Sequence, residues 1–282
     1  MASDVGLLEL ENEVQAMTSS YETLLVERKE GYAVIKFNRP DKFNAANAQV
    51  FKDLAAAVAE LDADRDVGCI VLTGQTFTHP KKGTPYHVFS AGADVEQFAS
   101  VGKIEAGYDF IKLCFEPFKA IEHSETPVIA AVNGAAFGFG FEIQGCCDFS
   151  FASTNARFAL KELNHGALPA WAVTRGVERY GNSTIAYLAM STIEVEPAEA
   201  RRLGIVIDVF EPDDLLPKVE EIAKRVAKAS YIGKTFIKRS LNRNATAQYE
   251  DAERYMPTVF ASQVMQSAFA RFLGGETRNV KN

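Results

Sequence analysis

The chain has 282 residues, of which 47% are hydrophobic and 24% are charged, and its formal net charge is −7. This composition is typical of a soluble globular protein with one large core, and an acidic balance without a basic stripe argues against nucleic-acid binding. No apolar run reaches membrane-spanning length, and the acidic N-terminal sequence MASDVGLLELENEV lacks the pattern of a signal peptide. We therefore expect a cytoplasmic protein that engages neither nucleic acid nor a membrane.

The first third of the chain predicts an arm, a hairpin, a helix and a buried strand. Residues 1–20 are weakly amphipathic and predict a helical arm. The elements expected after it are strands at Tyr21–Arg28 and Tyr32–Asn38 around the Lys29-Glu30-Gly31 turn, a helix at Asn47–Leu61, a strand at Cys69–Leu72, and a Gly-, Pro- and Lys-rich surface loop at Gly74–Tyr86.

The segment from Pro127 to Glu162 carries the most informative pattern. Pro127–Val132 is short, apolar and β-branched, as in a buried strand. Asn133-Gly134 ends this strand, and Gly138-Phe139-Gly140 opens a helix whose first turn contains Glu142. Glycines let the backbone approach a ligand closely, and the first turn of a helix presents unpaired N–H groups. The segment therefore predicts a site that can hold an oxyanion beside a carboxylate.

Helical patterns dominate the remainder of the chain. An amphipathic helix is expected at Ile104–Ile121, and further helices are expected at Leu215–Lys228, Ile232–Asn242 and Tyr249–Leu273. Alternating strands and helices through the central segment predict an α/β fold with mostly parallel strands. We divide the chain into an N-terminal arm (1–20), a core with the active site (21–212) and a helical C-terminal region (213–282).

Cysteine and histidine residues show no ligand spacing. The four cysteines lie in apolar segments and indicate reduced thiols, and the histidines do not form a pattern such as HxxxH. We expect neither a metal site nor a tightly bound cofactor.

Five segments spread over most of the chain carry a recognisable set of motifs. They are NRPDKFNA at Asn38–Ala45, FSAGAD at Phe89–Asp94, PVIAAVNG followed by GFGFE at 127–142, ARFALKELNHGALP at Ala156–Pro169, and EARRLGIVIDVF at Glu199–Phe210. Together they resemble the crotonase family, the enoyl-CoA hydratase/isomerase superfamily. The resemblance implies a crotonase-like fold of repeated ββα units with a helical C-terminal region that serves oligomerisation and pocket closure. It also implies a homotrimer, or a hexamer made of two trimers.

The resemblance assigns catalytic roles to four positions. The oxyanion hole corresponds to the backbone N–H groups of Ala93 and Phe139, although the family usually has glycine at the second position. Glu142 and Glu162 match the two glutamates that flank water in the family's hydratases. Glu142 is expected to hold and activate the water, and Glu162 to give a proton to C2 of the acyl group. Two carboxyl groups in a small dry cavity should also raise one another's pKa.

Coenzyme A, as part of the substrate, is the ligand that the resemblance implies. The residues expected to contact it or the acyl group are Lys42, Ala91, Gly92, Asp94 and Gly138. Lys42 is a candidate phosphate contact.

Three residues near the second glutamate need separate interpretation. His165 is the best alternative general base, although a hydrogen-bonded loop histidine is the commoner role. Trp171 stands where the family often has a glycine-rich turn, and it is either a core or interface anchor or a pocket residue. Lys161 replaces the usual proline, and we expect its side chain to point outward.

The sequence therefore predicts an acyl-CoA enzyme, an enoyl-CoA hydratase-like lyase of the kind found in fatty acid metabolism. It would add water across an enoyl-CoA double bond or catalyse the reverse dehydration. Two alternatives stay open. The first is other chemistry on this fold, by an enoyl-CoA isomerase, an acyl-CoA hydrolase or a retro-Claisen C–C hydrolase. The second is a non-catalytic crotonase-like binding subunit.

Overall fold

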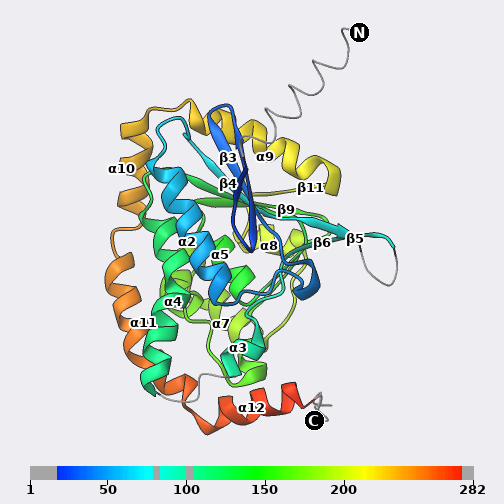
Figure 1. The fold of residues 1–282 in the computed structure, drawn as a ribbon, viewed down its shortest axis with the longest axis vertical. Coiled ribbons are helices and arrows are strands. Elements are labelled where there is room, and N and C mark those ends of the chain that lie inside the picture. The colour runs from blue at the N-terminus through cyan, green and yellow to red at the C-terminus, as the bar shows by residue number, and fades with distance from the viewer. Residues whose placement is uncertain (1–17, 79–82, 100–103, 275–282) are drawn as a thin grey trace.

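The computed structural model describes residues 18–78, 83–99 and 104–274, which form a mixed α/β protein with two sheets (Figure 1). The predicted N-terminal arm lies mostly outside these residues. Its last part, Thr18–Ser20, forms strand β1 rather than helix and pairs with β2. Within the described residues, every helix is too short or too polar to cross a bilayer.

The larger sheet has seven strands in the order β1-β2-β3-β4-β7-β9-β11. The first three strands are antiparallel, and from β3 onward each strand is parallel to its neighbour. This agrees with the expected mostly parallel architecture. The remaining bounds are β2 Leu24–Lys29, β3 Tyr32–Phe37, β4 Ile70–Gly74, β7 Val128–Val132, β9 Phe149–Ser153 and β11 Asp208–Phe210.

Both faces of the larger sheet are buried. In β3, Ala33 and Ile35 face the main core, whereas Tyr32 and Val34 face a second cluster on the other side. Helix α9 (Pro212–Ala227) covers that second face with an apolar stripe that includes Leu215. Helices α2 (Ala48–Ala63) and α4 (Ile104–His123) pack with the main core. Burial on both faces explains why the central strands are continuous apolar runs.

A second, smaller sheet was not predicted from the sequence. Its order is β10-β8-β6-β5, with bounds Arg157–Ala159, Ala135–Phe137, Pro85–Ser90 and Thr76–Thr78. Strands β10, β8 and β6 are parallel, and β5 is antiparallel to β6. The prediction of a surface loop over Gly74–Tyr86 is therefore wrong for β5 and for the start of β6. Cross-strand pairing of Thr76–Thr78 with Pro85–His87 satisfies backbone groups that a loop would expose.

The helices expected from the sequence lie close to their predicted bounds, with one exception, whereas α3, α6, α7 and α8 were not predicted. The predicted helix at Tyr249–Leu273 is two helices, because Ser262 caps a new one by accepting a hydrogen bond from the Met265 N–H. The bounds are α3 Val95–Ala99, α5 Phe139–Cys146, α6 Val177–Tyr180, α7 Asn182–Ser191, α8 Pro197–Arg202, α10 Tyr231–Leu241, α11 Ala245–Phe260 and α12 Gln263–Leu273. Two short 3₁₀ helices, Pro40–Lys42 and Glu162–His165, and a π-helix, Ala172–Gly176, complete the described elements. Figure 1 shows α11 beside α4 and α12 turning across the end of the molecule.

Candidate active site

The smaller sheet brings the predicted site segments to one edge. Its three parallel strands β6, β8 and β10 end at Ser90, Phe137 and Ala159, and a site segment follows each strand. Because the carboxyl ends of adjacent parallel strands meet at the same edge, loops distant in sequence converge there. The segments are Ala91–Asp94, Gly138-Phe139 and Lys161-Glu162.

Two glycines with positive φ shape this edge. Gly92 has φ +113° and Gly138 has φ +49°, so both adopt a conformation that a side chain disfavours. The two backbones also approach closely, because a Cβ on Gly138 would lie 3.8 Å from Gly92 Cα. The next residue in each case is a predicted N–H donor, Ala93 or Phe139. Gly138 is also the N-cap of α5.

The Ala93 N–H is oriented by its neighbours. Ala46 donates its N–H to Gly92 O and accepts the Asp94 N–H, each at 2.8 Å. This bridge turns the intervening Ala93 N–H away from Ala46. The Phe139 N–H is the first of helix α5 and therefore has no acceptor within the helix. Among the described residues neither N–H donates to a protein acceptor, so both are free for a ligand oxygen.

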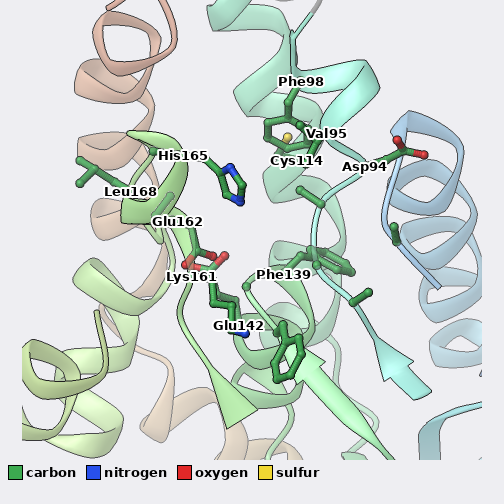
Figure 2. A pocket seen from close by; sticks show the side chains of 18 of the residues that line it. Asp94, Val95, Phe98, Cys114, Phe139, Glu142, Lys161, Glu162, His165 and Leu168 are labelled. Atoms are coloured by element: carbon green, nitrogen blue, oxygen red, sulfur yellow. The ribbon is translucent and has the colours of Figure 1, made fainter. Parts of the chain in front are cut away.

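A cavity of about 420 Å³ lies at this edge. Ten of the predicted site residues line it: Lys42, Ala91, Gly92, Ala93, Asp94, Gly138, Phe139, Glu142, Glu162 and His165. Trp171 does not line the cavity. Figure 2 shows Glu142 and Glu162 with their carboxyl groups side by side, and the imidazole of His165 directed into the same space.

Glu142 is held by the start of the π-helix. It lies in the first turn of α5 with 7% of its surface exposed. Its Oε1 accepts the N–H of Trp171 at 2.9 Å and the N–H of Ala172 at 3.0 Å. Burial and the neighbouring charge of Glu162 raise the pKa of Glu142 well above its usual value, while the two N–H donors oppose that shift. One oxygen is thus fixed by the protein, and the other can face the cavity.

Glu162 lies directly above Gly138. A Cβ on Gly138 would come within 2.8 Å of Glu162 Oε1, so only glycine leaves room for this carboxyl group. Burial raises the pKa of Glu162 to about 7. Its Oε2 is buried and has no hydrogen-bond partner in the described part of the chain. A buried carboxyl oxygen without a donor favours the protonated form, so the two glutamates together retain a proton near neutral pH.

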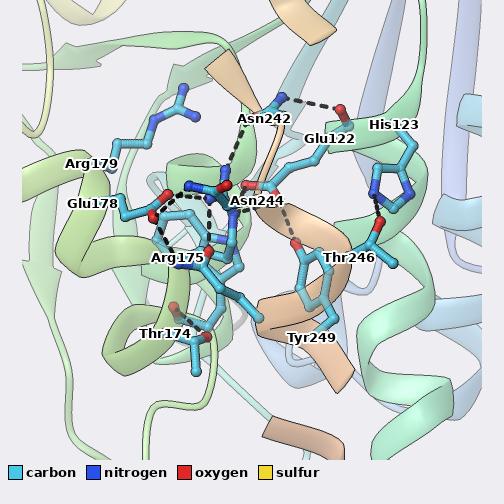
Figure 3. A network of polar contacts seen from close by, with 12 residues as sticks. Glu122, His123, Thr174, Arg175, Glu178, Arg179, Asn242, Asn244, Thr246 and Tyr249 are labelled. Carbon is cyan, nitrogen blue, oxygen red and sulfur yellow. Dashed lines mark hydrogen bonds and ion pairs between the residues drawn. The ribbon is translucent and has the colours of Figure 1, made fainter. Parts of the chain in front are cut away.

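A buried polar network supports the segment that holds Glu142 (Figure 3). Glu122 of α4 accepts a bifurcated hydrogen bond from Arg175 Nε–H, at 3.0 and 3.2 Å to its two oxygens, and another from Tyr249 Oη at 2.7 Å. It also accepts the indole N–H of Trp171 at 3.4 Å. The Glu122 and Arg175 side chains are 0% and 4% exposed. Trp171 is therefore tied to Glu122 by its side chain and to Glu142 by its backbone, which shows it as a core anchor.

Other predicted residues have protein partners of their own. Asp94 pairs with Arg39 at 3.1 Å, and Lys42 pairs with Glu96 at 3.0 Å in an exposed position. Lys161 forms an ion pair with Glu194, and its Nζ lies 4.5 Å from the centroid of the Phe137 ring. Lys161 also lines the cavity, so its side chain does not simply point outward as expected. His165 packs edge-on against Phe272 of α12, and burial lowers its pKa.

Sequence reasoning missed the apolar wall of the cavity. Helices α2, α3, α4, α11 and α12 contribute Phe51, Phe98, Ile111, Cys114, Phe115, Phe118, Met256, Phe260, Phe269 and Phe272. The four of these residues that lie on α4, Ile111, Cys114, Phe115 and Phe118, follow helical spacing along one face. Such a pattern predicts core packing as readily as a cavity wall. Among the described residues we find no cluster of three or more His, Cys, Asp or Glu side chains able to hold a metal ion, and all four cysteines are free and buried.

Two adjacent acidic side chains and a pair of free N–H groups therefore border one cavity on this α/β framework. A family model described as enoyl-CoA hydratase/isomerase matches residues 27–277. The chain belongs to this family, which confirms the crotonase resemblance and the predicted fold class.

Named relatives point to the same class. The chain is 34% identical over 224 residues to crotonyl-CoA hydratase of Syntrophomonas wolfei, covering 79% of this chain and 82% of that protein. It is 31% identical over 238 residues to the short-chain-enoyl-CoA hydratase of Clostridium acetobutylicum, covering 84% and 87%. A solved enoyl-CoA hydratase/isomerase from Xanthobacter autotrophicus Py2 shares the fold, with a TM-score of 0.80, 24% identity and 91% and 95% coverage. Family and relatives together support an enzyme of hydratase (lyase) type.

Proposed function

We propose that the protein hydrates the double bond of an enoyl-CoA, or dehydrates the corresponding 3-hydroxyacyl-CoA. The observation that carries this proposal is the pairing of Glu142 and Glu162 beside the free N–H groups of Ala93 and Phe139 in one cavity. The crotonyl-CoA and short-chain-enoyl-CoA hydratases among the relatives support the same reaction. Coenzyme A enters as part of the substrate.

The two N–H groups are proposed to act as the oxyanion hole. When water adds at C3, negative charge develops on the thioester oxygen, and donors aimed at that oxygen lower the barrier. Loss of one such donor typically costs about 3–4 kcal/mol. The close approach of Gly92 and Gly138, which precede the two donors, supports this role, and no described protein acceptor competes for the two N–H groups.

The two glutamates are proposed to divide the proton transfers. The pair shares one proton, because burial raises the pKa of both groups. When that proton is on Glu162, the two N–H donors at Oε1 stabilise the charge of Glu142, which takes a proton from the attacking water. Glu162, whose Oε2 has no donor among the described residues, is the better carrier of the proton that reaches C2. The water oxygen bonds to C3, one proton passes to Glu142 and one leaves Glu162, so the pair holds one proton before and after the reaction. Dehydration reverses these steps.

The charged end of the coenzyme is proposed to lie at the exposed mouth of the cavity. Lys42 and Glu96 are 44% and 68% exposed there and border the Ala91–Asp94 segment. A phosphate group would compete with Glu96 for Lys42 in this position.

Conservative substitution of the two carboxyl groups tests the proposal. Glu142→Gln and Glu162→Gln should each lower kcat for crotonyl-CoA by about 100- to 10,000-fold, the range of general acid–base catalysis. Loss of the absorbance of the conjugated thioester measures the rate, and titration calorimetry with butyryl-CoA checks that the site still binds. The control is Glu194→Gln, which removes an exposed carboxylate that pairs with Lys161. Parent-level rates in both active-site variants would refute the assignment.

Oligomerisation into a trimer or hexamer is proposed from the outer surface of α10. Ile232, Phe236, Ile237 and Leu241 are each between 63% and 66% exposed on that helix. An apolar surface of this kind normally marks an interaction site. Light scattering after size-exclusion chromatography should give three or six times the chain mass, and a monomer at micromolar concentration would contradict this proposal.

A further inference from the structure

The cavity is lined by exposed charged side chains and by buried apolar ones. Its charged and exposed lining residues, Lys42 and Glu96, lie at the mouth. The apolar wall includes side chains that are almost fully buried, such as Phe51, Ile111 and Phe260, at 1%, 2% and 2% exposure, whereas Phe272 is 50% exposed. The glutamate pair lies in the same cavity, so a substrate anchored at the mouth would direct its acyl chain toward this wall.

The apolar wall is built from interlocking rings on elements far apart in sequence. Phe139 contacts Phe51 of α2 with ring centroids 5.3 Å apart, and Phe118 of α4 at 5.6 Å. Phe98 of α3 contacts Phe260 of α11 at 5.8 Å. Phe139 therefore extends an aromatic wall rather than closing the site, and the wall is fixed by packing among five helices, α2, α3, α4, α5 and α11. Such a surface suits an apolar ligand, and aromatic rings in particular.

The volume exceeds what the smallest enoyl group needs. A cavity of about 150 Å³ lined by apolar side chains can hold benzene, whereas this cavity measures about 420 Å³. The thioester, the double bond and one water leave space for a group of ring size beyond C3. The ten apolar residues of the wall carry no charge, and His165, which packs on Phe272, is a polar neighbour of the wall. A polar acyl tail would lose its hydration there without compensation.

We propose that the substrate of this enzyme is an enoyl-CoA whose acyl group extends beyond C3 by a bulky apolar group, an alkyl chain or a phenyl ring, rather than a crotonyl group. This inference rests on the proposed hydration and names the substrate class of the same site. Each methylene buried in the wall contributes up to about 0.8 kcal/mol, or about fourfold in kcat/KM.

A panel of three acyl groups tests the inference. Octenoyl-CoA has four more methylenes than crotonyl-CoA, and their full burial would raise kcat/KM by at most about 250-fold. We expect the kcat/KM of octenoyl-CoA to exceed that of crotonyl-CoA by at least about tenfold. Cinnamoyl-CoA represents the aryl acyl groups. Its reaction is measured in reverse, as dehydration of 3-hydroxy-3-phenylpropionyl-CoA, because conjugation of the double bond with the ring opposes hydration. A larger gain for the octenoyl or the phenylpropionyl substrate distinguishes the alkyl from the aryl tail. Crotonyl-CoA as the best of the three substrates overturns the inference.

A wall substitution tests the location of the tail. Ile111→Phe places a ring in the cavity and should reduce the ratio of octenoyl to crotonyl kcat/KM by about tenfold or more. Leu113→Phe is the matched control, since Leu113 is a partly buried residue of the same helix that does not line the cavity. An unchanged ratio in Ile111→Phe, with the protein folded by circular dichroism, contradicts the location.

Binding without turnover separates this inference from the proposed reaction. Octanoyl-CoA and butyryl-CoA have no double bond to hydrate, and calorimetry should show octanoyl-CoA binding at least about tenfold more tightly. Tighter octanoyl-CoA binding without hydration of any enoyl-CoA refutes the reaction and keeps the apolar acyl site. Equal affinities refute the site even if hydration occurs.

Discussion

Replacing Gly138 by alanine tests the contact that positions Glu162. Gly138 has φ +49° and ψ −116°, a conformation that L residues rarely adopt. The added Cβ would lie 2.8 Å from Glu162 Oε1 and 3.6 Å from its Cδ. The substitution therefore strains the backbone and pushes the carboxyl group out of its place.

The two effects have separate magnitudes. Backbone strain in a sparsely populated region costs about 1–3 kcal/mol, which should appear in the free energy of unfolding measured with urea. Displacement of a catalytic group by about 1 Å can cost about 100-fold in rate. We expect Gly138→Ala to lower kcat for enoyl-CoA hydration by about that factor, because the same residue also aims the Phe139 N–H.

A second glycine separates strain from displacement. Gly181 has φ +84° and ψ 151°, but a Cβ there would meet nothing within 4 Å. Gly181→Ala should lose comparable stability and keep the parent kcat. The reasoning is refuted if Gly138→Ala retains kcat within about threefold of the parent while Gly181→Ala shows the expected loss of stability.

Three further predictions concern the carboxyl pair and its support. Because burial raises the pKa of Glu162 from 4.5 to about 7, the folded protein keeps a proton that the unfolded chain releases. The free energy of unfolding should therefore fall as the pH rises from about 4.5 to about 7. Glu162→Gln should flatten this pH dependence, measured by urea titration at each pH. In Gly145→Ala, the added Cβ would lie 2.5 Å from the Trp171 ring. Both kcat and the free energy of unfolding should fall, although alanine is more favourable than glycine in a helix by about 1 kcal/mol. A more stable, fully active variant would contradict the rigid placement of Trp171. Tyr249→Phe removes a 2.7 Å hydrogen bond to buried Glu122; it should cost about 1.5–3 kcal/mol of stability, whereas Glu178→Gln at the exposed edge of the network should change stability by less than about 0.5 kcal/mol.

Local patterns in the sequence were enough for most helices and central strands. The buried strand Val128–Val132, the helix beginning at Phe139 and the position of Glu142 in its first turn all follow from features within a few residues. The same holds for α9 and α10, whose observed bounds differ from the predicted ones by at most three residues. Hydrophobic periodicity depends only on which faces of a segment are buried, so it predicts the type and the approximate bounds of each of these elements.

Features that depend on distant partners were not predicted. Strands β8 and β10 have three residues each and show no periodicity, so the smaller sheet is visible only once β6, β8 and β10 pair. The apolar wall could not be predicted for the same reason, because the apolar face of α4 does not reveal from sequence whether it packs in a core or lines a cavity. Glu122 and Arg175 are 53 positions apart, and each alone reads as an ordinary charged surface residue.

The three departures from the family pattern share a physical feature: the proposed chemistry uses none of the departing side chains. The ring of Phe139 packs with Phe51 and Phe118, and its backbone N–H stays free. Lys161 pairs with Glu194 and lies over the Phe137 ring. Trp171 anchors its indole at Glu122 and gives its N–H to Glu142. A site that relies on main-chain donors and two carboxylates can therefore exchange the neighbouring side chains. Phe139 and Lys161 both line the cavity, and the exchange at Phe139, whose ring belongs to the apolar wall, is the one that should change which acyl group fits.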